Sequence, residues 1–199
     1  MRKLILTAAT AAAVLLPAAA FAHAGGHTPA DGFWHGFAHP IGGLDHILAM
    51  LGVGFLAYVM GGRALYLVPL SFVGMMVAGF GLGLVGFEMP FLEFGILASV
   101  IVIGTLGALG RPIPLGAAMA TVGAFALFHG VAHGAEMPVA TSGLTYGLGF
   151  AAATALLHAA GLGLGFAGSA AASRMGRTLA RIGAGVTALV GLGLAAGLA

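Results

Sequence analysis

Two short histidine-rich segments stand where long apolar stretches begin or end. They read "HPIGGLDH" (39–46) and "FHGVAHGAE" (128–136), and their candidate ligands are His39, Asp45 and His46 in the first and His129, His133 and Glu136 in the second. Imidazole nitrogens and carboxylate oxygens together suit divalent ions such as Ni²⁺, Co²⁺ or Zn²⁺. The chain has no cysteine, which excludes a thiolate site. The two segments therefore indicate binding of a divalent transition-metal ion.

The spacing in the first segment favours a ligand strip on a helix. His39 and His46 are seven residues apart, so on one continuous helix they share a face two turns apart. Pro40 is predicted at the first helical turn, where its missing N–H costs nothing. Asp45 would point off the shared face and toward a neighbouring helix.

The second segment predicts another strip. His129, His133 and Glu136 follow an i, i+4, i+7 pattern, which is one stripe of a helix. Glu93 and His158 also lie in apolar segments, and ionisable groups within membrane spans are usually functional. Both are counted as candidate ligands. Glu93 fits equally a charge at a helix start, and His158 a hydrogen-bonded packing residue.

The composition is that of a membrane protein. Of the 199 residues, 60% are hydrophobic and only 6% are charged, whereas soluble domains carry about 25% charged residues. An all-α polytopic membrane protein is predicted. The seven Lys and Arg residues form no basic patch with stacking aromatics, so nucleic acid is not an expected partner. The chain has no GxxxxGK[ST] motif and hence no ATP-binding loop of that kind.

Six apolar segments match the roughly 30 Å hydrocarbon core of a bilayer. They cover about 38–60, 64–86, 91–110, 113–134, 142–168 and 179–198. Residues 1–22 have the basic start, the apolar centre and the "AFA" site of a secretory signal peptide. The predicted architecture is thus a signal peptide, 1–22, followed by one six-helix domain, 23–199. An uncleaved first helix is the alternative.

The positions of the arginines predict how these segments are oriented in the membrane. Cytoplasmic loops are enriched in Lys and Arg, and the predicted loops after the first, third and fifth segments, with the residue just beyond them, hold Arg63, Arg111, Arg174, Arg177 and Arg181. Both termini of the mature chain should then be periplasmic at the inner membrane. The two histidine segments and Glu93 fall in the outer half, with His158 deeper. The 36 glycines favour close helix packing and permit a homo-oligomer through glycine-rich faces.

The two histidine segments resemble the signature motifs of the HupE/UreJ family, and the likeness extends over essentially the whole chain. This resemblance implies a secondary permease for nickel, or for cobalt in some members, associated with hydrogenase or urease maturation. Carried over by position, the implied functional residues are His39, Asp45, His46, His129, His133 and Glu136, with Glu93 as the acidic residue of the third span and Phe72 as an aromatic of the second.

The expected function is therefore transport and not catalysis. Ni²⁺, Co²⁺ or Zn²⁺ is the cargo, and no prosthetic group is expected. Two other classes remain open. An intramembrane zinc hydrolase would need fixed ligands, an activated water and a base such as Glu136, but the chain has no HExxH motif. A b-type haem subunit would use paired transmembrane histidines, against which the nearby Asp45 and Glu136 argue.

Overall fold

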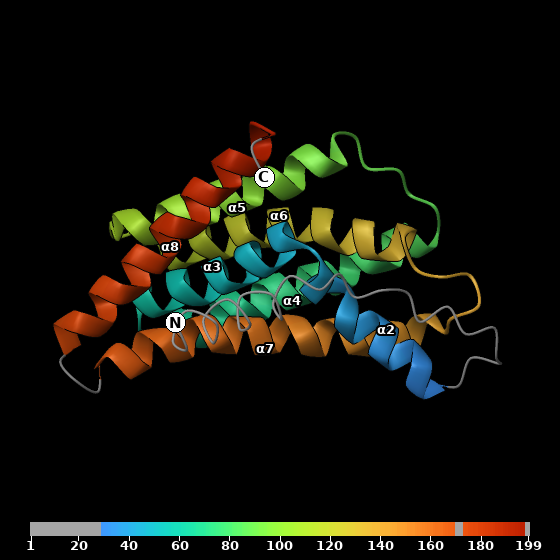
Figure 1. Cartoon of the computed structure of the whole chain (residues 1–199), viewed down its shortest axis with the longest axis horizontal. Coiled ribbons are helices and arrows are strands. Elements are labelled where there is room, and N and C mark those ends of the chain that lie inside the picture. Colours follow the sequence, from blue (N-terminus) through green and yellow to red (C-terminus); the bar gives the residue numbers. More distant parts are fainter. Residues whose placement is uncertain (1–28, 170–172, 198–199) are drawn as a thin grey trace, which may run out of the picture.

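The computed structural model describes residues 29–169 and 173–197, and every regular element in those ranges is an α-helix. The predicted signal peptide, 1–22, and its cleavage site lie outside the described residues. The helices are α2 (Pro29–Gly42), α3 (Leu44–Met60), α4 (Ala64–Leu84), α5 (Leu92–Leu109), α6 (Leu115–Ala135), α7 (Gly143–Ser169) and α8 (Ser173–Ala195). They pack as one bundle of long, roughly aligned helices (Figure 1).

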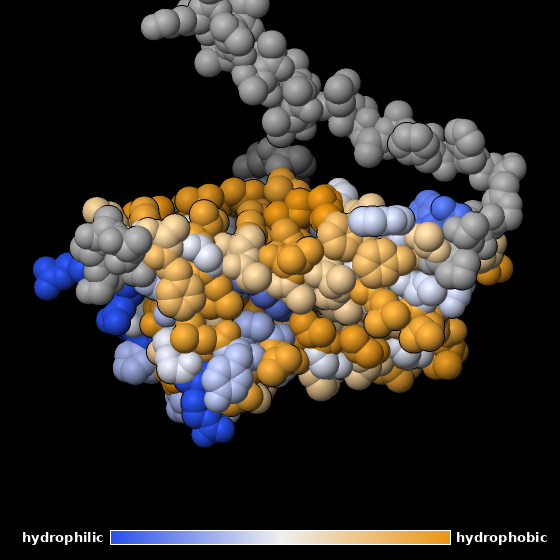
Figure 2. Space-filling view, turned by 90° about the horizontal axis from the view of Figure 1, so that it is seen from below, coloured by the Kyte–Doolittle hydropathy of each residue, from blue (hydrophilic) through white to orange (hydrophobic). Residues whose placement is uncertain are grey.

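The bundle has the surface of a membrane protein. Five of its helices, α4 to α8, are long and apolar enough to span a bilayer, and α2 with α3 passes the same test as a bent pair. The face drawn in Figure 2 is largely hydrophobic, with hydrophilic side chains toward its ends. An all-helical fold with up to six spans is thereby confirmed for the described residues.

The first predicted span is broken, so the expectation of one continuous helix from about residue 38 was wrong. α2 runs from Pro29 to Gly42, α3 begins at Leu44, and the two are bent by 84°. Pro40 lies inside α2 and not at a first turn. A proline inside a helix removes a hydrogen bond and clashes with the preceding turn, and Gly43, extended at φ −104° and ψ 122°, makes the corner.

Glycines allow the helices to approach closely. α4 and α6 meet at Gly83 and Gly134, where an added Cβ would lie 2.5 Å from the carbonyl oxygens of Val131 and Phe80 respectively. The expected packing role is confirmed at these contacts. Other glycines, among them Gly81, have no atom within 4 Å of such a Cβ. Association of copies through glycine-rich faces stays a prediction.

Close contacts at glycines also hold helix α2 against the end of α7, and Figure 1 shows the two side by side. A Cβ on Gly36 of α2 would overlap the carbonyl oxygen of Tyr146, and one on Gly149 of α7 would overlap that of Phe33. Only glycine permits this backbone approach, and it fixes where the last turn of α2, with its His39, lies.

Candidate metal site

Four histidines from three helices meet inside one end of the bundle. The ring of His46 lies 4.8 Å from that of His129 and 5.0 Å from that of His133, measured between ring centroids. His39 lies 4.9 Å from His133 and 6.4 Å from His46. His129 and His133 are fully buried, whereas His39 and His46 are partly buried. The structure thus brings together all four histidines of the two predicted motifs.

The broken span explains how His39 and His46 come into this cluster. His39 is in the last turn of α2 and His46 in the first turn of α3, so they stand on either side of the 84° bend. The spacing had predicted that the two residues share one face of a straight helix, and this prediction was wrong. His129 and His133 are one turn apart near the end of α6 and follow the predicted stripe.

Two carboxylates each hold one histidine of the cluster. Asp45 Oδ1 accepts the backbone N–H of His46 at 2.8 Å and lies 2.9 Å from its ring Nδ1. Glu136 Oε2 lies 2.9 Å from Nε2 of His39. A carboxylate in contact with a histidine nitrogen accepts its N–H and leaves the other nitrogen as a bare lone pair. Both carboxylates therefore orient a histidine in this structure.

Several buried ring nitrogens of the cluster have no hydrogen-bond partner in the described part of the chain. They are Nε2 of His46, Nδ1 of His129 and both nitrogens of His133. Leaving a buried polar atom unpaired costs roughly 1–3 kcal/mol. The lone pairs of His46 and His129 are acceptors without donors. A metal cation is one group that would satisfy several of them at once.

The side chains are not yet in ligating positions. Within the described ranges, no three His, Asp or Glu side chains are already arranged to hold a metal ion together. Imidazole nitrogens bind zinc at about 2.0–2.1 Å, so rings whose centroids are about 5 Å apart must turn their free nitrogens toward a common point. That turn is a side-chain rotation, and of the four rings only those of His39 and His46 adjoin the neighbouring cavity.

An open cavity of about 470 Å³ adjoins the cluster. Its lining includes His39, His46 and the carboxylate residues Asp45, Glu93 and Glu136, and among the described residues no Lys or Arg. Glu93, in the first turn of α5, is exposed and thus stands at the wall of this cavity instead of among the buried histidines. The cavity is acidic, and it leads from the surface to the histidine cluster.

His158 lies apart from the cluster, near the middle of α7. Its buried ring is 5.2 Å from Phe72, whose ring is 5.6 Å from that of His129. Both nitrogens of His158 are without a hydrogen-bond partner among the described residues. The structure therefore places this predicted ligand outside the cluster of the other four histidines, with the ring of Phe72 beside both His158 and His129.

Sequence reasoning missed the second layer around the histidines. Ser99 Oγ contacts His129 Nε2 at 2.8 Å, Phe150 stacks on His133 at 4.9 Å, and Tyr146 lies 6.0 Å from His39. Serine and aromatic residues are ordinary in membrane helices, so their types gave no signal. Helical periodicity shows which residues share a face of a span. It would identify the residues that surround the histidines only if the packing partners of each helix were known.

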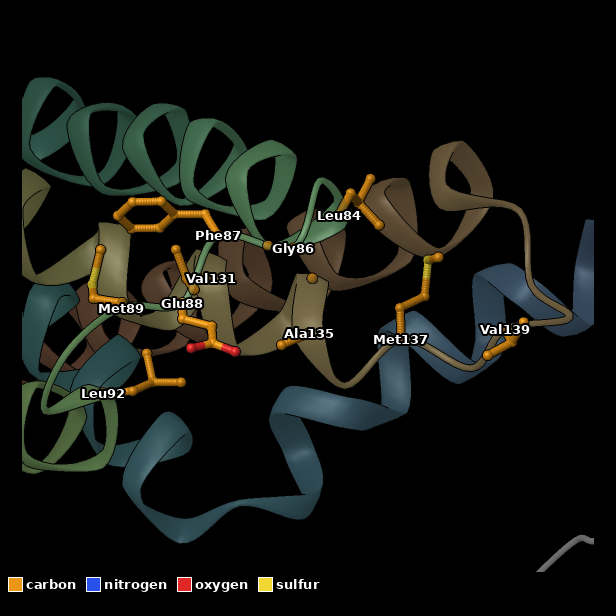
Figure 3. A pocket seen from close by; sticks show the side chains of 12 residues that line it. Leu84, Gly86, Phe87, Glu88, Met89, Leu92, Val131, Ala135, Met137 and Val139 are labelled. Carbon is orange, nitrogen blue, oxygen red and sulfur yellow. The ribbon is translucent and has the colours of Figure 1, made fainter.

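A roomier cavity of about 700 Å³ lies elsewhere, between the end of α4, the following loop and α6. Figure 3 shows Glu88 there among apolar side chains that include Phe87, Val131 and Met137. None of the candidate ligands lines it. One carboxylate among apolar groups gives no imidazole donor set, so the metal site is not assigned there.

The fold and the cluster define a polytopic helical membrane protein with imidazole and carboxylate groups inside its bundle. The chain belongs to the HupE/UreJ family, whose model, described as HupE / UreJ protein, matches residues 11–194. This is a transporter family, implicated in nickel and cobalt transport for hydrogenase and urease. The resemblance carried by the two motifs is thus confirmed.

One curated relative shows how far the similarity extends. Protein HupE of Rhizobium leguminosarum bv. viciae is 44% identical over 188 residues, which make up 94% of this chain and 96% of that protein. No solved structure matches the chain.

Proposed function

We propose that this protein is a secondary permease that carries a divalent transition-metal ion inward across the bacterial inner membrane. Nickel is the first candidate cargo and cobalt the second, since nitrogen and oxygen donors without sulfur suit both. The observation that carries the proposal is the cluster of His39, His46, His129 and His133 beside an acidic cavity.

The entry step follows from the charges of the cavity. Asp45, Glu93 and Glu136 line it without any Lys or Arg, and a cleft lined by one sign of charge concentrates the opposite ion. The hydrated cation would gather there, exchange water for imidazole nitrogen, and move from the cavity to the buried cluster. In this proposal the carboxylates attract the ion and orient His39 and His46, and they remain candidate ligands once the rings turn.

His158 is the next station in the proposal. It is buried beside Phe72, and its nitrogens, which have no hydrogen-bond partner among the described residues, would receive the ion on its way inward. The ring of Phe72 lies beside both His129 and His158. In this proposal the Phe72 ring has to move for the metal ion to pass, and it blocks uncontrolled passage of ions when it does not.

The membrane potential is a sufficient driving force. Moving one charge through 100 mV is worth about 2.3 kcal/mol, so a divalent ion gains about 4.6 kcal/mol, a ratio of roughly 10³. This agrees with the lack of a GxxxxGK[ST] motif. The proposed orientation has both mature termini in the periplasm, and the proposed role is supply of metal for a hydrogenase or a urease.

The test is uptake of Ni²⁺, Co²⁺ and Zn²⁺ by proteoliposomes with an imposed inside-negative potential. Nickel or cobalt should accumulate, and His133→Ala should abolish the accumulation. The matched control is Thr187→Val, at a buried position of α8 whose hydroxyl bonds its own helix at Gly183, which should transport normally. A wild-type protein that accumulates none of the three ions would contradict the proposal.

A further inference from the structure

Ser99 makes two short contacts at a fully buried position of α5. Its Oγ lies 2.6 Å from the carbonyl oxygen of Ile96, one turn earlier in the same helix. It also lies 2.8 Å from Nε2 of His129 on α6. Both distances are within the normal range for hydrogen bonds, so the question is which atom supplies the hydrogen in each.

Counting hydrogens answers it. A serine hydroxyl has one hydrogen, and a carbonyl oxygen can only accept. The two contacts are both hydrogen bonds only if Ser99 donates to Ile96 and His129 donates to Ser99. Nε2 of His129 then carries the hydrogen. In a neutral imidazole the other nitrogen, Nδ1, is left with the lone pair. That atom is buried and has no partner among the described residues.

We propose that Ser99 is a positioning residue of the metal site. It holds His129 in the Nε2–H tautomer and presents Nδ1 as the atom that binds the metal. This inference rests on the proposed transport function for the metal, while the tautomer itself does not depend on it.

His46 shows the same arrangement, except that Nδ1 contacts the acceptor and Nε2 is the nitrogen without a partner among the described residues. Asp45 accepts from Nδ1 of His46 at 2.9 Å, and Nε2 of His46 is the buried nitrogen without a partner in the described ranges. The two rings are 4.8 Å apart and nearly perpendicular, at 89°. Metal-binding histidines almost always donate their second N–H to a fixed acceptor, and Ser99 supplies that acceptor for His129.

A hydroxyl acceptor also differs from a carboxylate. A carboxylate raises the basicity of the histidine it holds and thereby strengthens the metal bond. The neutral Ser99 oxygen orients His129 without adding a negative charge. A site that combines two carboxylate-held histidines, His39 and His46, with the hydroxyl-held His129 would bind an ion and still release it, as transport requires.

The first measurement is ¹⁵N NMR of His129 in metal-free protein labelled at histidine, in lipid nanodiscs near neutral pH. The wild type should show a protonated Nε2 and a bare Nδ1. Ser99→Ala should lose that preference and give a mixture of tautomers, and Ser99→Thr, which keeps the hydroxyl, should restore it. Thr121→Ala is the matched control, because Thr121 bonds its own helix at Ala117 and its loss should leave His129 unchanged.

The second measurement is Ni²⁺ binding by calorimetry on the same proteins. Ser99→Ala should weaken affinity by roughly 10–100-fold, the usual effect of losing such a partner, with Ser99→Thr within a few-fold of wild type. A wild-type His129 protonated at Nδ1, or an unchanged tautomer or affinity in Ser99→Ala, would overturn the inference. If instead the wild type binds no Ni²⁺ or Co²⁺, the transport proposal fails, and the NMR result still decides the tautomer.

Discussion

At the residue scale, the histidines of the cluster differ in the group that contacts one of their ring nitrogens. Glu136 holds His39, Asp45 holds His46, Ser99 holds His129, and His133 has no hydrogen-bond partner in the described part of the chain. In this structure the carboxylates contact histidines, which they orient. Variants can therefore separate the effect of orienting a histidine from the effect of the negative charge.

Glu136→Gln keeps an oxygen that can accept the N–H of His39 and removes the charge. If Glu136 acts by orienting His39, Ni²⁺ affinity should stay within a few-fold of wild type in Glu136→Gln and fall at least tenfold in Glu136→Ala. Calorimetry on both purified variants measures this. Equal losses in the two would mean that the negative charge, as ligand or as attractor, is what the site needs.

External acid should weaken metal binding. Metal ligation requires neutral imidazole, and the reference imidazole pKa is about 6.5. Below that value protons occupy the ligand nitrogens, so affinity is highest above it and falls as pH drops. From pH 7 to pH 5 the loss would be up to roughly 20-fold for a ligand histidine that keeps the reference pKa. His46→Gln should bind more weakly. Initial uptake at clamped internal pH tests this, and a flat profile would mean that no histidine that titrates between pH 5 and pH 7 is a ligand.

His158→Leu should separate transport from binding. The ring of His158 is 5.2 Å from that of Phe72 and outside the cluster of the other four histidines, so the outer site would remain intact without it. The expected result is Ni²⁺ affinity within threefold of wild type and uptake reduced at least tenfold. Calorimetry and proteoliposome flux on the same preparation give the two values. Normal flux would make His158 a packing residue.

The sequence predicted which residues belong to the candidate site and not how they are arranged. His129 and His133 kept the expected stripe because α6 is one uninterrupted helix. The pairing of His39 with Glu136 joins residues far apart in the chain, and the contact of Ser99 with His129 depends on how α5 packs on α6. Neither follows from helical periodicity.

At the element scale, the bend between α2 and α3 is the feature that builds the site. It turns α2 along α7 and brings its last turn toward α6. The signal for it was present, since Pro40 and the pair Gly42–Gly43 are helix breakers. The high hydrophobicity of 38–60 favoured a single span, and hydropathy carries no information on bends.

Gly149→Ala should disturb this arrangement from a distance. The added methyl would overlap the backbone of Phe33, and would therefore push α2 off α7 and His39 away from Glu136. Overpacking typically costs roughly 1–3 kcal/mol. The apparent melting temperature in nanodiscs should fall by several degrees and Ni²⁺ affinity at least fivefold. Gly163→Ala, on the same helix with no atom within 4 Å of its added Cβ, should do neither; equal effects would refute the role of the close contact.

At the scale of the whole molecule, charge is separated along the bundle. The chain has five Asp and Glu residues, and all of them lie in α2, at the start of α3, in the loop before α5 and its first turn, or at the end of α6. The arginines of the described ranges lie in the connections at the opposite end or in the first part of α8, where Arg181 donates to the carbonyls of Ala108 and Leu109 at 2.9 and 3.1 Å. In Figure 1 the start of α8 is at the other end of the bundle from α2.

This separation predicts the orientation in the membrane. Arginine-rich ends stay in the cytoplasm, so the acidic cavity should open to the periplasm and the C-terminus should be periplasmic. A phosphatase fused at Ala199 should be active, whereas the same enzyme fused after Gly62, in the α3–α4 turn, should be inactive, and a fluorescent protein at each point should give the reverse pattern. The two fusions control each other for expression. An active phosphatase after Gly62 would place the acidic cavity on the cytoplasmic side. The membrane potential would then draw cations away from the cluster, and the proposed inward transport could not work as described.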